Sequence, residues 1–288
     1  MLPALGFAVL AAGCSSGSPV SQRSLSVGVE SAPPPPRGAL VLGDESGRRA
    51  VALAVGKGRL TATVLAPEGG PLSGLKVVFR DGSQVIPASP CGLGCYSAST
   101  RARPREIEVR LSGSRPVSFD IPAQTRPAAA IVARAARTTR ALKSLVYTEA
   151  LRSGPTGGLL TTWSLQAPDE VEYRIRGGAD AVVLGTRRWD RDRPGAPWRR
   201  SQQIPALRVP QPAWGSRATN AYVLSTARVN GRPVWVVSFA NPTTPAWFTA
   251  WIDRATYRPL RLHMTAAAHF MTHRYLAFDR PLKIEPPR

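Results

Sequence analysis

The stretch AWFTAWIDRATYRPLRL, residues 246–262, carries the strongest structural signal in the chain. Two apolar runs flank a short polar segment, Asp253 to Thr256, which has the composition of a tight turn. Because alternate residues of a strand point to opposite faces, the first run would have two different faces. One face carries Trp247, Thr249 and Trp251, and the other carries Phe248, Ala250 and Ile252. The stretch predicts a hairpin in which one set lines a cavity while the other packs elsewhere.

Strand-like runs surround this hairpin throughout residues 128–288. They include VEYRI around Tyr173, AYVLSTARV, RPVWVVSFA and HFMTHRYLAFD, with a turn at Asn230-Gly231. The segment AAAIVARAARTTRALKSLVYTEAL, residues 128–151, instead has apolar residues at spacings of three and four, which is typical of an amphipathic helix. A long antiparallel sheet cannot stay flat, so we expect it to curl around that helix.

The order of these segments resembles the LolA, LolB and LppX superfamily of envelope lipoproteins. The resemblance lies in the helix followed by SLQAPDEVEYRI, VLGTRRW, a proline-rich loop, GRPVWVVSF, WFTAWIDRATYRPLRL and RYLAFDRPLKIEPP. It covers roughly residues 128–288, and its best marker is the strand, acidic turn and strand of AWIDRATYRPLRL. It implies a half-open barrel wrapped around a helix, with an apolar cavity for acyl chains or for the lipids of lipoproteins.

Residues 38–123 form a separate unit of short strand-like runs divided by turn residues. In one of them Ile107, Val109 and Leu111 alternate with charged residues, so one face is buried. The number and spacing of the runs are typical of an immunoglobulin-like sandwich. The run TATVLAPEGGPLSGLKVVF and the late FDIP strand resemble the CopC or YtkA type of exported module, but the copper ligands of CopC are absent because this unit has no histidine. The predicted fold class is therefore mainly β (α+β), with a sandwich followed by an antiparallel half-barrel around one main helix.

The first residues, MLPALGFAVLAAGC, form an apolar run that ends in small residues and Cys14. The run is too short to span a bilayer. It resembles the lipobox of bacterial lipoproteins, and this implies a signal peptide over residues 1–14 with a lipid attached to Cys14. The polar and proline-rich residues 15–37 are expected to form a tether. We therefore expect an exported protein that is anchored to the outer face of the cell membrane.

The chain is strongly basic, with 38 Lys and Arg against 18 Asp and Glu and a formal net charge of +20. Basic composition alone would suggest nucleic acid as a partner. Export argues against that partner, and the arginines are scattered along the chain instead of forming one basic run. The composition favours attraction to an anionic lipid surface and no nucleic-acid partner.

Cys91 and Cys95 lie in SPCGLGCY, where two glycines allow the chain to close a small ring. In an oxidising compartment such a pair is expected to form a disulfide. A ring of about five residues stabilises by only ~2 kcal/mol through lost chain entropy. The disulfide would therefore fix a loop without holding the fold together.

Motifs for catalysis are absent from the sequence. It contains no HExxH pair and no P-loop, and GPTGG at 154–158 lacks the flanking strand and helix of a dinucleotide loop. A cysteine nucleophile would need a nearby histidine, and the histidines lie far along the chain. We predict no catalytic residues and a protein that is not an enzyme.

The three histidines share one stretch, HMTAAAHFMTH. If residues 269–273 form a strand, His269, Met271 and His273 share a face, and imidazole and thioether groups are ligands that suit copper. The alternative is that Met271 is packing and that both histidines are polar partners on the sheet. A metal site usually needs a third or fourth ligand that the sequence does not locate, so copper is the second reading and no cofactor is the first.

Aromatic residues provide the candidate ligand site, with Trp198, Trp214, Trp247, Trp251 and Tyr173 expected at the cavity or its lid. By resemblance, the proline-rich stretch 193–215 would lie at the cavity mouth, with Trp198 and Trp214 as lid residues. An ordinary core and a surface loop are the alternatives. The leading hypothesis is a lipid-binding envelope lipoprotein, followed by copper handling, and then by a structural adaptor beside a membrane-protein partner.

Overall fold

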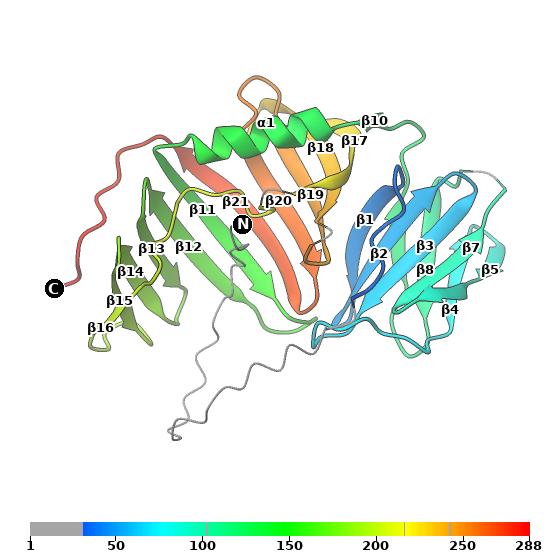
Figure 1. Ribbon diagram of the computed structural model, residues 1–288, viewed down its shortest axis with the longest axis horizontal. Helices are drawn as coiled ribbons and strands as arrows, with labels where there is room; N and C mark the ends of the chain where they lie inside the picture. Colours follow the sequence, from blue (N-terminus) through cyan, green and yellow to red (C-terminus); the bar gives the residue numbers. More distant parts are fainter. Residues whose placement is uncertain (1–30, 102, 216, 242) are drawn as a thin grey trace.

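The computed structural model describes residues 31–288 except Ala102, Ser216 and Pro242. Within these residues the chain forms one helix and three antiparallel sheets, which are arranged as a sandwich beside a much larger sheet (Figure 1). The protein is therefore mainly β, as the sequence predicts. Cys14, the predicted signal and most of the predicted tether lie outside the described residues.

The sandwich has one five-stranded and one four-stranded sheet. The first has the order β1 (Leu40–Ser46), β2 (Arg49–Gly56), β3 (Arg59–Leu65), β7 (Cys95–Ser99) and β6 (Ser89–Gly92). The second has the order β5 (Gln84–Pro87), β4 (Val77–Asp81), β8 (Glu106–Leu111) and β9 (Val117–Asp120). Alternate apolar residues of both sheets, including Leu53, Phe79 and Ile107, are buried between them. The alternation seen in the sequence therefore produces the core of the sandwich.

The large sheet has twelve strands, and its order combines two meanders. One runs through β17 (Thr219–Val229), β18 (Arg232–Asn241), β19 (Ala246–Asp253), β20 (Pro259–Ala266) and β21 (His269–Phe278), with β10 (Arg126–Pro127) at its free edge. The other runs through β11 (Ser144–Arg152), β12 (Leu159–Gln166), β13 (Glu170–Ile175), β14 (Asp180–Leu184), β15 (Arg187–Arg191) and β16 (Arg199–Gln202). The pairing of β11 with β21 joins the two meanders.

The predicted hairpin of residues 246–262 is formed by β19 and β20. One Asp253 carboxylate oxygen accepts hydrogen bonds from the backbone N–H groups of Ala255 (3.0 Å) and Thr256 (2.8 Å). This side chain therefore holds the turn, in the way expected of aspartate at such a position. The Asn230-Gly231 turn between β17 and β18 also forms, with positive φ at both residues.

The helix is shorter than the sequence predicts. Helix α1 spans Ala129–Arg140, with Ala141 as its C-cap. Residues 144–152 form β11 instead of further helical turns. The apolar spacing that suggests helix continues to Leu145, but β11 is paired on both sides, with β12 and with β21. Tertiary pairing of a β-branched and aromatic segment therefore overrides its helical spacing. No helix among the described residues is long and apolar enough to cross a membrane.

Helix α1 packs against one face of the twelve-stranded sheet, which we call the inner face. Its residues Val132 and Ala135 are buried with Phe239 of β18, Phe248 of β19 and Leu262 of β20. Figure 1 shows the helix crossing over the strands at one end of the sheet. The buried residues of α1 are Val132, Ala135, Ala136 and Thr139, so the helix covers the sheet with a stripe of helical spacing, while Ile131 and Thr138 of the spacing seen in the sequence are half-buried.

The opposite, outer face of the large sheet packs against the sandwich. Strand β2 reads Ala50, Val51, Ala52, Leu53, Ala54 and Val55; its alanines face the large sheet while its larger residues enter the sandwich core. Trp247 and Phe270 of the large sheet are buried together with these alanines, and we call this group the interdomain cluster. An Arg152–Glu45 ion pair with a 2.7 Å N–O distance borders it. Small side chains on one surface therefore make room for aromatic rings on the other.

The predicted disulfide between Cys91 and Cys95 is present and links β6 to β7. The proline-rich segment before the sandwich lies along this hairpin, because Pro33 is close enough to Gly92 to leave no space for a Cβ there. Ala32 is buried in the interdomain cluster. Ala32 and Pro33, near the end of the predicted tether, therefore pack against the folded part of the chain.

The contact of Gly43 with Trp247 provides a test of the interdomain packing. A Cβ at Gly43 would lie 2.6 Å from the Trp247 Cβ, so Gly43→Ala must displace a backbone. We expect a loss of about 1–3 kcal/mol in the free energy of unfolding, measured by urea denaturation. The control is Gly70→Ala, because a Cβ at Gly70 meets nothing within 4 Å. Equal effects of the two substitutions would contradict the close packing.

Candidate functional site

Four aromatic side chains form a row across the inner face of the large sheet. Tyr275 of β21 is opposite Tyr147 of β11, which is opposite Trp163 of β12, which in turn is opposite Tyr173 of β13. The ring centroids of neighbours along the row are 5.6, 6.1 and 4.9 Å apart. Because the four residues hold matching register positions, they form a continuous aromatic row.

A buried polar cluster lies at the β21 end of the aromatic row. His273 Nε2 is 2.8 Å from a carboxylate oxygen of Glu149, and His273 Nδ1 is 3.4 Å from the Tyr275 hydroxyl. His273 is only 3% exposed. Burial raises the pKa of the Tyr147 and Tyr275 hydroxyls, and the nearby Glu149 carboxylate raises both further. Both tyrosines are therefore neutral at physiological pH.

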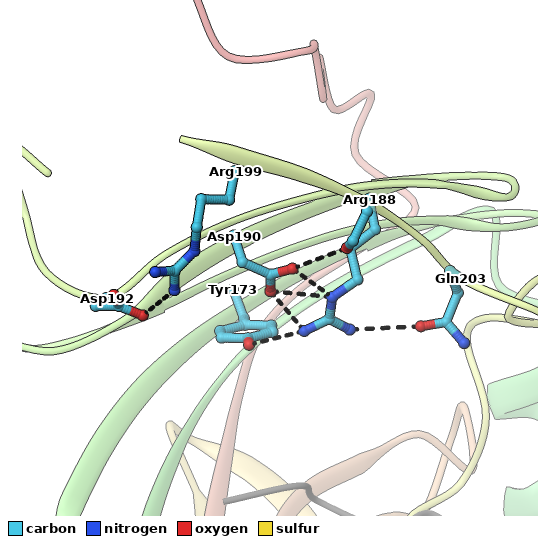
Figure 2. A network of polar contacts seen from close by, with 7 residues as sticks. Tyr173, Arg188, Asp190, Asp192, Arg199 and Gln203 are labelled. Atoms are coloured by element: carbon cyan, nitrogen blue, oxygen red, sulfur yellow. Dashed lines mark hydrogen bonds and ion pairs between the residues drawn. The ribbon is translucent and has the colours of Figure 1, made fainter. Parts of the chain in front are cut away.

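A second polar network lies at the other end of the row (Figure 2). The Arg188 guanidinium donates to Asp190 through Nε at 2.8 Å, to the Tyr173 hydroxyl at 3.3 Å and to Gln203 at 3.4 Å. Burial raises the pKa of Tyr173, while the charge of Arg188 opposes that rise. Arg188 thus fixes the last ring of the row and also holds Gln203, where the chain leaves β16.

The segment of residues 203–215 covers part of the inner face without forming regular structure. Val209 is buried and donates its backbone N–H to the Pro168 carbonyl at 2.9 Å. Trp214 is 1% exposed and packs edge-on against Phe239, with ring centroids 5.6 Å apart. Arg140, at the end of α1, donates to the Gly215 carbonyl at 3.3 Å. Helix and segment therefore form one cover, which Figure 1 shows as the yellow chain beside α1.

The inner face is filled by side chains under this cover. Two open hollows stand out on the described residues, and neither lies between α1 and the sheet. One lies at the β15–β16 hairpin, and the other lies on the β4, β5 and β8 surface of the sandwich. Four buried polar atoms have no hydrogen-bond partner among the described residues: the indole nitrogens of Trp163 and Trp235, the Ser238 hydroxyl oxygen and one Glu45 carboxylate oxygen. Such groups are uncommon in folded proteins, and the Trp163 group belongs to the aromatic row.

The structure brings only part of the predicted ligand site together. Tyr173 lies in the aromatic row, and Trp214 lies in the cover of the same face. Trp247 and Trp251 instead lie on the outer face, where Trp247 contacts the sandwich and the Arg261 guanidinium stacks over Trp251. The set of β19 that faces the helix is therefore Phe248, Ala250 and Ile252. Alternation predicts two faces correctly, but it does not say which one receives the helix.

Trp198 is also separate from the inner face. It precedes β16 and stacks under the Arg191 guanidinium, whose strand position is on the outer face. It therefore does not meet Trp214 as a second lid residue. Sequence reasoning missed Tyr147, Trp163 and Tyr275. Tyr147 lies in the segment that was interpreted as helix. Trp163 and Tyr275 lie in strand-like runs, where alternation would have assigned each of them to one face of its strand.

The histidine strand forms as expected, but its side chains are engaged in other contacts. His269, Met271 and His273 all lie on the inner face of β21, with Met271 opposite Met264 and His273 opposite Leu262. Both ring nitrogens of His273 have protein partners, and His269 Nδ1 lies 3.0 Å from the Ala267 carbonyl. Among the described residues no three His, Cys, Asp or Glu side chains are grouped to hold a metal ion. Copper therefore stays a hypothesis that rests on the shared face of His269, Met271 and His273.

Comparison with solved structures finds a similar fold over about half of this chain. The lipoprotein LppX of Mycobacterium tuberculosis matches at 13% identity and a TM-score of 0.43, over 54% of this chain and 97% of its own. LprF of Mycobacterium bovis matches at 13% and 0.41, over 55% and 95%. A LolA superfamily protein of Nitrosomonas europaea matches at 11% and 0.28, over 55% and 96%. At these identities and TM-scores no ligand or activity follows.

Two other comparisons give no match. No protein-family model matches the sequence. No curated protein is significantly similar to it.

The Glu149–His273 pair provides a test of the polar cluster. Glu149→Leu leaves His273 Nε2 buried without its partner, and we expect a loss of about 1–3 kcal/mol in the free energy of unfolding. The double variant Glu149→Leu/His273→Leu should lose no more than the single one, because an apolar pair replaces a polar pair. Urea denaturation of both single variants and the double variant measures the coupling. Purely additive losses would show that the two side chains do not act as a pair.

Proposed function

We propose that this chain is an exported, membrane-anchored protein that binds an apolar, lipid-type ligand between the aromatic row and the segment of residues 203–215. The observation that carries the proposal is the nature of the cover on the inner face. Regular structure covers only the part under α1, and an irregular segment covers a further part with Leu207, Val209 and Trp214, while the rings of Tyr147, Trp163 and Tyr173 stay half-buried. Side chains of the protein thus occupy an apolar space that a ligand of similar chemistry would fill.

The cover is suited to local opening. Its backbone makes few hydrogen bonds to the sheet, among them those of Val209 to Pro168 and of Gln203 to Thr186. Segments that are held mainly by side-chain packing open at a smaller free energy than paired strands do. Displacement of Trp214 would expose Phe239, and an acyl chain could replace the lost contact.

The aromatic row supports a ligand that is apolar and carries a polar end. Rings in the row offer flat apolar surfaces, and the indole N–H of Trp163 is buried without a hydrogen-bond partner. A carbonyl or hydroxyl oxygen of a lipid could accept that hydrogen bond, whereas a plain hydrocarbon could not. A few placed polar groups in an apolar lining are typical of small-ligand sites.

Export and anchoring are part of the same proposal. The lipobox-like run before Cys14 supports lipid attachment at that residue, and the Cys91–Cys95 disulfide fits an oxidising compartment outside the cytoplasm. We expect a ligand-binding protein and not an enzyme, because the sequence has none of the motifs searched for above. A membrane lipid is then both the anchor and the nearest source of ligand.

A second candidate function is a structural adaptor that holds no ligand. The filled inner face favours it, since side chains already satisfy the apolar surface beneath α1 and the segment. In that case the sandwich and sheet would serve as surfaces for a membrane-protein partner. The experiment below separates the two candidates.

Lipid uptake by variants of Trp214 tests the proposal. The full chain, purified from membranes, is expected to carry lipid in native mass spectrometry and to bind a fluorescent acyl probe. Trp214→Leu removes part of the side chain that competes with the ligand, and we expect about tenfold tighter probe binding because a larger fraction of the protein is then open. Truncation of a buried tryptophan also destabilises, so thermal unfolding must show that the variant is folded.

The matched control is Trp251→Leu on the outer face, which should leave probe binding unchanged. Absence of co-purified lipid, together with no probe uptake by the parent or by Trp214→Leu, would leave the adaptor as the function.

A further inference from the structure

The hairpin of β15 and β16 has a surface hollow that is not part of the inner face. An open hollow of about 560 Å³ lies on its outer face and is lined by Trp189, Trp198, Arg191 and Arg200, with Arg288 beside them. Strand register places Trp189 opposite Arg200 and Val182, on the side away from Tyr173. The hollow is therefore separate from the proposed ligand site.

Positive charge at this hairpin exceeds what its own carboxylates neutralise. Residues 187–202 contain six arginines and two aspartates. Ion pairs join Arg188 to Asp190, Arg199 to Asp192 and Arg191 to Asp180. The remaining three, Arg187, Arg193 and Arg200, form no ion pair with a carboxylate in the described part of the chain. All three are exposed.

The two tryptophans are held at the surface by arginine. Arg191 lies 4.6 Å from the ring centroid of Trp198, and Arg187 lies 5.7 Å from that of Trp189. Both indoles are half-buried. Charged residues on an edge strand discourage pairing with other chains, which accounts for Arg199 and Arg200. It does not account for two large apolar rings beside them.

We propose that the outer face of the β15–β16 hairpin docks on an anionic phospholipid surface. Charge complementarity carries the proposal, since the unpaired guanidinium groups of Arg187 and Arg200, which strand register places on the outer face, match phosphate in charge and in hydrogen-bonding geometry. Tryptophan prefers the boundary between the headgroups and the acyl chains, where its ring is in an apolar layer and its N–H is near water. Figure 1 places β14–β16 at the opposite end of the molecule from the sandwich, so the hairpin can approach a flat surface freely.

Vesicle co-sedimentation tests this docking. The full chain with Cys14→Ala, which has no thiol for lipid attachment there, is mixed with neutral phosphatidylcholine vesicles or with vesicles that also contain phosphatidylglycerol. The neutral vesicles measure any binding by the first, apolar residues. We expect tighter binding to the anionic vesicles, and Arg187→Gln/Arg200→Gln should weaken that binding about 30-fold. Trp198→Ala should weaken it several-fold at unchanged charge.

The matched control removes the same charge elsewhere. Arg59→Gln/Arg105→Gln alters two exposed arginines of the sandwich and should change anionic-vesicle binding less than threefold. An equal loss in the control pair would mean that only the overall charge matters, and the docking face would be wrong. Equal binding of the parent to neutral and anionic vesicles would also overturn it.

A last arm separates a membrane from a soluble anion. Inorganic phosphate or a soluble sulfated polysaccharide is added at constant ionic strength, and binding is followed by isothermal calorimetry. If either binds with the same dependence on Arg187 and Arg200 while anionic vesicles do not bind, the hollow is a soluble-anion site and membrane docking is excluded. Circular dichroism of every variant confirms that it is folded.

Discussion

The pairing of β11 with both β12 and β21 is the interaction on which the rest of the structure depends. It joins two meanders into one twelve-stranded sheet. Within each meander, the paired strands follow one another directly in the chain. Strand β11 also carries Tyr147 and Glu149 to the middle of the inner face, where the aromatic row meets the buried polar cluster. Had this segment remained helical, the sheet would be split and both features would be lost.

The two faces of the large sheet impose different demands where they are covered. Over β17–β20 the outer face meets another sheet, so close approach is possible only where one partner is small, as with Gly43 and the alanines of β2. The inner face meets a narrow helix that cannot cover its whole width, and part of the remainder is covered by a segment without regular structure. The large sheet thus has one side with close sheet-to-sheet packing and one side whose cover is partly irregular.

Much of this architecture could be predicted from alternation and turn chemistry. The hairpin of β19 and β20, the Asn230-Gly231 turn and the Cys91–Cys95 disulfide all depend on interactions between residues close in sequence. In the sandwich, alternation within single strands such as β8 indicates which face is buried. The end of α1 could not be predicted, because residues 144–152 are held between β12 and β21, and β21 is more than a hundred residues away in the sequence. For the same reason the sequence assigned Trp247 to a cavity, since the choice between the two faces depends on where the sandwich and the helix pack.

The two free edges of the large sheet have a consequence for the membrane anchoring proposed above. One edge is β10, which has two residues and includes Pro127, and the other is β16, which has four residues and begins with two arginines. Proline cannot donate to a ladder, and like charges repel a second copy of the same edge. Confinement to two dimensions raises encounter rates between neighbouring molecules, and a large sheet would then be at risk of growing from chain to chain into fibres. The short edge strands β10 and β16 make such polymerisation unfavourable, so protein molecules at high surface density could remain separate.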